Sequence, residues 1–76
     1  DKIHHEKLLS LVFDNDDFEN LQMTEELIHK HKLSSQVRLV NKKDGCLQAA
    51  IFVTGHKKQI KKLDETLLTI KQLRSF

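Results

Sequence analysis

The chain's only cysteine, Cys46, opens an apolar run directly after the charged segment 41–45. A cysteine in this position has three interpretations: a small apolar residue at the start of a strand, a metal ligand, or a reactive thiolate. A thiolate needs a cationic neighbour, and Lys42 and Lys43 lie only a turn away. We expect the packed, apolar role, with the metal and redox roles as alternatives.

Two histidines, His29 and His31, stand near the end of a predicted helix and are the other candidate metal ligands. Residues two apart in a regular helix point about 200° apart, so this pair does not chelate one ion unless the helix frays. The simpler role of these histidines is electrostatic. A histidine beside Lys30 and Lys32 interacts favourably with the negative end of the helix dipole.

The acidic segment 14–17 resembles a calcium loop only in the spacing of its carboxylates, because the glycine of such a loop is missing. We expect this segment to cap a helix, since carboxylates accept the free N–H groups of a helix N-terminus. His56 follows Gly55 and is expected to help start a second helix. Lysine pairs at 57–58 and 61–62 recur at helical spacing and predict a solvated helix face.

Composition limits the class of protein. The chain has 76 residues and a formal net charge of +2. A chain this short buries only about 60% of the surface of its unfolded form, which favours self-association or a bound metal. A single thiol suits a reducing compartment, so we expect a cytoplasmic protein. The charge is low for a nucleic-acid-binding protein, no apolar run is long enough to span a membrane, and no motif of an enzyme class is present.

The hydrophobic pattern predicts one domain over residues 1–76. The predicted elements are, in chain order, a strand over 8–13, a helix over 17–32, a strand over 36–40, a strand over 46–54, a helix over 57–72 and a strand from Leu73. The pair Ser34–Ser35 is expected to end the first helix. Val37 and Leu39 are expected to face inward. An Asp-Gly pair at 44–45 predicts a tight hairpin turn.

This order is that of the split βαβ, ferredoxin-like plan: an α+β fold whose four-stranded antiparallel sheet carries two helices on one face. The other face of such a sheet stays uncovered. Leu8, Val12, Ala50 and Phe52 fall on that face by alternation. A bare apolar face usually meets a partner, so these four residues are the predicted interface of a homo-oligomer, formed face to face or edge to edge.

The sequence resembles the C-terminal regulatory domain of the nickel-responsive repressor (NikR) family, an ACT-like module. The resemblance rests on the stretches "LSLVFDND", "LIHKHKL" and "DGCL", on the spacing of Gly55, Ile60, Leu63 and Leu73, and covers almost the whole chain. Standalone ACT-like regulators, such as the iron-only hydrogenase system regulators, match the hydrophobic spacing about as well.

The resemblance implies a tetrameric ligand-sensing core with nickel at a subunit interface. Cys46 matches the family's cysteine ligand, and His29 or His31 matches a helix histidine from a neighbouring subunit. The family's His-x-His pair falls at Arg38 and Val40, where this chain departs from the pattern.

The function implied is that of a metal- or small-ligand-responsive regulatory domain of a transcriptional regulator. The candidate cofactor is a divalent transition metal such as nickel. Such a domain is a dimer or tetramer, is not an enzyme, and does not itself contact nucleic acid or a membrane. The alternative is an oligomerisation or protein-interaction module that has no ligand.

Overall fold

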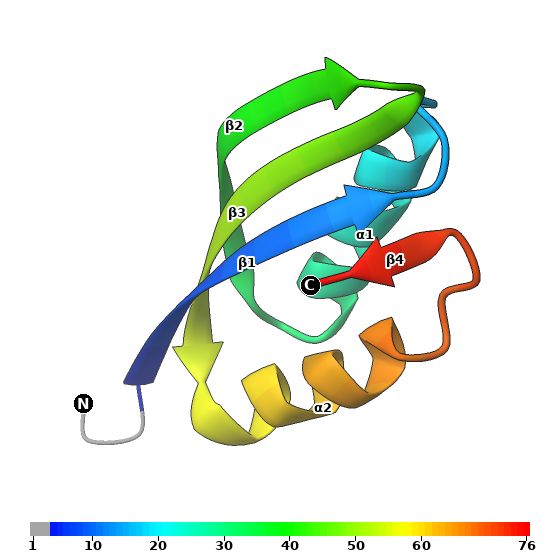
Figure 1. The fold of residues 1–76 in the computed structure, drawn as a ribbon. Coiled ribbons are helices and arrows are strands. Elements are labelled where there is room, and N and C mark those ends of the chain that lie inside the picture. Colours follow the sequence, from blue (N-terminus) through cyan, green and yellow to red (C-terminus); the bar gives the residue numbers. More distant parts are fainter. Residues whose placement is uncertain (1–3) are drawn as a thin grey trace.

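The computed structural model describes residues 4–76, so the first three residues of the predicted domain lie outside the described residues. The elements are β1 (His4–Phe13), α1 (Glu19–Lys30), β2 (Ser34–Lys43), β3 (Cys46–His56), α2 (Lys57–Leu67) and β4 (Leu73–Ser75). The four strands form one antiparallel sheet in the order β2-β3-β1-β4 (Figure 1). The predicted α+β class, with a four-stranded antiparallel sheet and two helices, is therefore confirmed.

One hydrophobic core joins the sheet to the helices. Alternate residues of the two central strands are buried, namely Leu9, Leu11 and Phe13 of β1 and Leu47, Ala49, Ile51 and Val53 of β3. The same cluster includes Leu21 and Ile28 of α1 and Ile60, Leu63 and Leu67 of α2. Cross-strand partners point to the same side of a sheet, so the register of β1 and β3 gathers these side chains on one face. Both helices bury their apolar stripes in this cluster.

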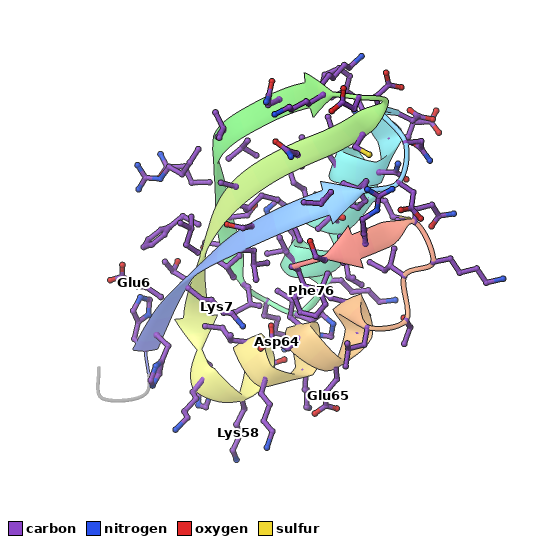
Figure 2. All side chains as sticks on the ribbon, in the orientation of Figure 1. Glu6, Lys7, Lys58, Asp64, Glu65 and Phe76 are labelled. Atoms are coloured by element: carbon purple, nitrogen blue, oxygen red, sulfur yellow. The ribbon has the colours of Figure 1, made fainter. Side chains whose placement is uncertain are left out.

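The central strands extend beyond their predicted bounds. They pair without interruption from His4 opposite His56 to Phe13 opposite Leu47. Lys7 lies in this extension, and its ammonium contacts both carboxylate oxygens of Asp64 on α2, at 2.9 and 2.7 Å (Figure 2). The hydrophobic pattern did not reveal this extension, because the residue pairs that form it are mostly polar.

The helix α1 begins where the acidic segment was expected to cap it. The carboxylate of Asp17 accepts the backbone N–H of Glu19 at 2.9 Å. The side chain of Asn15 in turn accepts the backbone N–H of Asp17 at 3.0 Å. These short local contacts fix the chain between β1 and α1. The capping prediction holds only in part, because the N-cap is Phe18, which makes no side-chain cap hydrogen bond, and Asp17 binds one N–H from the position before it.

The end of α1 is set by backbone geometry. Lys32 has a left-handed φ of 62°, and its N–H donates to the carbonyl of His29 at 2.9 Å. The N–H of Leu33 donates to the carbonyl of Ile28 at 3.2 Å. This pair of bonds is a Schellman closure, which stops the helix at once. The prediction that Ser34–Ser35 ends the helix was wrong, because both serines belong to β2.

The strand β2 differs most from its prediction. Leu39 does not face inward, and its side chain is 60% exposed, whereas Val37 lies on the core side of the sheet as predicted but is still 37% exposed. The register shifts between them, so that Val37 lies opposite Ile51 of the core while Leu39 lies opposite Ala50 on the other side. Arg38 is the extra residue of this β-bulge. The bulge moves the side chains of the second half of β2 to the opposite face.

The hairpin from β2 to β3 has the predicted tight turn. Asp44 and Gly45 have φ values of 54° and 77°, and positive φ at both central residues is typical of a type I′ turn.

The helix α2 starts as expected at His56, whose ring Nδ1 accepts the backbone N–H of Lys58 at 3.1 Å. It ends at Leu67 and not at residue 72, although Ile70 in the following turn still packs against the core. The final strand predicted from Leu73 is the short strand β4.

Candidate functional site

The side of the sheet that faces away from the core, called the outer face below, carries the predicted interface residues. Leu8 pairs with Phe52 and Ser10 pairs with Ala50, and Val12 follows on the same side of β1. Leu8 is 55% exposed, and Val12, Ala50 and Phe52 are half-buried. The structure therefore brings all four predicted residues together on one surface.

Leu39 is an outer-face residue that alternation along the sequence missed. Its side chain stands opposite Ala50 and is among the more exposed large apolar groups of the described chain. A hollow of about 180 Å³ is lined by this alanine together with Val12, Leu39 and Gln48. One signal was available, since the adjacent apolar residues Leu39 and Val40 interrupt a period of two, as a bulge does.

Two aromatic rings hold cations beside β2. The guanidinium carbon of Arg38 is 5.2 Å from the ring centre of Phe52, and the ammonium of Lys42 is 4.5 Å from that of Phe18. Phe52 belongs to the outer face, whereas Phe18 leads into α1 on the helix side. Positive charge therefore stands on both sides of β2. Exposed cation–π contacts contribute about 0.5–1 kcal/mol each.

The predicted metal ligands are not brought together within one chain. The Nε2 atom of His29 is 3.0 Å from the hydroxyl of Ser35, which pairs with Val53 of β3. Cys46 is the first residue of β3, and the stretch of strand from Cys46 to Val53 spans about 23 Å. His31 lies with His29 at the far end of α1. Within residues 4–76 no three histidine, cysteine or acidic side chains gather as a metal site.

Cys46 lies half-buried at the end of the outer face. Its sulfur is 4.0 Å from the carbonyl oxygen of Asp14. Arg74 of β4 is a cationic neighbour that sequence spacing did not reveal, and its Nε–H donates to the Asp14 carboxylate at 3.0 Å. The pKa of Arg74 is raised, mainly by this hydrogen bond to Asp14.

A cleft of about 350 Å³ lies between the two helices. It is lined by Met23, Glu26, Leu27 and Lys30 of α1 and by Thr66, Thr69 and Ile70 from α2 and the turn after it. The hydroxyls of Thr66 and Thr69 donate to backbone carbonyls at 3.0 and 2.7 Å, so they are already satisfied. The exposed side chains of Glu26 and Lys30 add one charge of each sign. The volume lies at the lower end of the range for small-molecule sites.

Comparison with known proteins assigns no family. No family model, no curated protein and no solved structure matches the chain. Among residues 4–76, no helix has the length and apolar character needed to cross a lipid bilayer. Function is therefore inferred from the outer face and the interhelical cleft.

Proposed function

We propose that this chain is a regulatory domain of ferredoxin-like, ACT-like fold that self-associates through its outer face and is not an enzyme. The strand order β2-β3-β1-β4 and the core cluster shared by both helices support the ferredoxin-like part. The observation that carries self-association is the exposure of large apolar side chains on the outer face, Leu8 at 55% and Leu39 at 60%. The partner is a second copy of the chain.

The size of the outer face sets the expected strength of this association. Three long strands of about 33 Å present roughly 450 Å² per copy, or about 900 Å² in a pair, at the usual strand spacing. Specific interfaces generally bury more than about 1,000 Å² in total, so the dimer should dissociate on dilution. The hollow over Ala50 would improve the fit if the two-fold axis passes close to Ala50, since Leu39 of one copy would then lie near the hollow of the other.

Sedimentation equilibrium over a range of protein concentrations tests the proposal. Leu8→Glu should shift the equilibrium to the monomer, since a carboxylate on the outer face would be desolvated in the pair. Leu68→Glu is the matched control, because Leu68 is 76% exposed next to α2 and lies outside the outer face. A wild-type chain that stays monomeric at high micromolar concentration, or equal effects of the two variants, would contradict the proposal.

A small-ligand response is a second candidate function, favoured by the interhelical cleft. A ligand with an apolar body would contact Leu27 and Ile70, and a charged group would meet Glu26 or Lys30. Thermal unfolding in the presence of a panel of small metabolites tests this. A ligand at a hundred times its dissociation constant adds about 2.7 kcal/mol of stability. Thr69→Phe, which fills the cleft, should remove the shift, and Leu68→Glu should retain it.

A metal-responsive form of this function requires two copies of the chain. Cys46 and the two histidines at the end of α1 lie toward opposite ends of β3, whose stretch from Cys46 to Val53 spans about 23 Å, so one ion reaches both only across an interface. Transcriptional regulation and the absence of direct contact with nucleic acid or a membrane rest on the resemblance and on composition. The cytoplasmic location rests on the single cysteine.

A further inference from the structure

The strand β2 presents a long free edge to its surroundings. It is the outermost strand of the sheet and pairs only with β3 (Figure 1). It is ten residues long, and none of its residues is buried. The opposite edge is formed by β4, which has only three residues. An edge strand carries a row of backbone N–H and C=O groups without partners, which is a template for a further strand.

The bulge at Arg38 divides this edge into two parts. The second part, residues 39–43, pairs in continuous register with β3 from Ala50 back to Cys46. Leu39 and Val40 stand on opposite faces of it and are 60% and 36% exposed. Residues 39–43 therefore form a regular stretch of strand whose edge away from β3 is free, with an apolar side chain on each face of the sheet.

The charge of this edge has one sign. The strand carries Arg38, Lys42 and Lys43 and no acidic residue. The rings of Phe52 and Phe18 hold the cations of Arg38 and Lys42 on the two faces of the strand. These two cations therefore lie on the two faces of the sheet next to β2, and Lys43 adds a third at the end of the strand.

A second copy of the chain is a poor occupant of this edge. Antiparallel pairing of β2 with itself would align a ladder with three cations on each side and no carboxylate. Like charges on neighbouring strands destabilise such a ladder. The complementary occupant has an extended backbone, apolar residues beside Leu39 and Val40, and carboxylates beside the cations.

We propose that residues 39–43 of β2 bind an acidic, extended segment of another protein by strand addition, with Arg38, Lys42 and Lys43 pairing its carboxylates. The backbone ladder supplies the attachment, and the charges select the partner. This site lies on the edge of the sheet and does not require self-association, although it shares Leu39 with the outer face. A substitution on the helix side of β2, such as Lys42→Glu, separates the two proposals.

Fluorescence anisotropy with a labelled probe peptide tests the proposal. The probe is acetylated and has valines at its centre and glutamates on both sides. A second peptide of the same sequence carries N-methyl groups on alternate residues, which block the hydrogen bonds of one of its edges. A third has lysines in place of the glutamates. The first peptide should bind, and the N-methylated and lysine peptides should bind at least about tenfold more weakly, which corresponds to about 1.4 kcal/mol.

Matched variants locate the binding site. Arg38→Glu with Lys42→Glu should weaken binding of the acidic peptide by about tenfold or more. Lys61→Glu with Lys62→Glu changes the net charge equally on the exposed face of α2 and should leave the affinity within about twofold. The single variant Lys43→Glu keeps both cation–π contacts and should still weaken binding. Circular dichroism checks that each variant is folded.

Three results would overturn the proposal. Equal binding of the N-methylated peptide would show that charge alone attracts the probe. Equal loss in the α2 variant would show that net charge, and not the edge, is responsible. Wild-type self-association that is abolished by Lys42→Glu alone, a substitution on the helix side of β2, would assign the edge to a second copy of the chain.

Discussion

Gly55 lies where β3 runs into α2, and the lack of a side chain there leaves room for Leu33. Its φ of 154° is a conformation that residues with a side chain rarely adopt. A Cβ atom at this position would overlap Cδ2 of Leu33, which is 4% exposed in the core. A side chain at this position would therefore cause both backbone strain and overpacking of the core.

Gly55→Ala should destabilise the domain by about 2–4 kcal/mol, combining backbone strain with overpacking of the core. Gly45→Ala is the control: Gly45 also has a positive φ, but nothing lies within 4 Å of the added Cβ. That variant should lose only the strain contribution, about 1–2 kcal/mol. Urea unfolding measures both changes, and equal losses would show that contact with Leu33 contributes nothing.

Cys46 is more accessible than its expected packed role implied, since it is half-buried at the end of the outer face. Cys46→Ala and Cys46→Ser should each change stability by less than about 1 kcal/mol, as substitutions outside the core usually do. A thiol reagent should label the folded protein without prior unfolding. Labelling that proceeds only at the rate of unfolding would show instead that the sulfur is packed.

At the scale of the element, the residues next to α1 and α2 cap the ends of these helices. Asp17 accepts one N–H of the first turn of α1, that of Glu19, and His56 accepts one of α2, that of Lys58. The C-terminal closure of α1 depends on Lys32, a residue with a side chain in the left-handed region that glycine favours. This closure brings Leu33 into the core, where it is 4% exposed.

Lys32→Gly should stabilise the domain by about 0.5–1 kcal/mol, because relief of left-handed strain exceeds the added freedom of the unfolded chain. Lys30→Gly, the same change in the last turn of α1, should destabilise by about 1 kcal/mol. Thermal and urea unfolding of the two variants show whether each substitution raises or lowers the free energy of unfolding. A loss of stability in Lys32→Gly would mean that the lysine side chain contributes more than the strain costs.

At the scale of the whole molecule, two ends of the sheet carry different chemistry. Cys46, Asp14 and Arg74 lie at one end, and the histidines of α1 lie at the other. The ion pair of Lys7 and Asp64 joins β1 to α2 between the layers (Figure 2). Its side chains are 40% and 34% exposed, so it contributes about 0.2–1 kcal/mol.

Tight nickel binding is not expected, because Arg38 and Val40 occupy the positions of the resembled family's imidazole ligands and the remaining candidates are far apart in one chain. Calorimetric titration with Ni²⁺ should give no nanomolar affinity, and Cys46→Ala should leave the weak binding unchanged. A nanomolar affinity that Cys46→Ala removes would instead require Cys46 of one copy and His29 or His31 of another to share the ion.

Much of this fold follows from local patterns. Alternation over residues 8–13 and 46–54 placed Leu8, Val12, Ala50 and Phe52 on one face, because successive side chains of any strand point to opposite sides. The Asp-Gly turn, the acidic cap of α1 and the role of His56 also follow from short-range chemistry, since each involves atoms within a few residues of one another.

The tertiary structure alone decided the features that depend on pairing between distant segments. The bulge at Arg38 placed Leu39 on the outer face, and its position arises from the register with β3; the adjacent apolar residues Leu39 and Val40 indicate a break in alternation but do not locate it. Arg74 reached Asp14 and Cys46 because β4 pairs with β1. The interhelical cleft likewise depends on how two helices from opposite halves of the chain pack, which the periodicity of either helix does not specify.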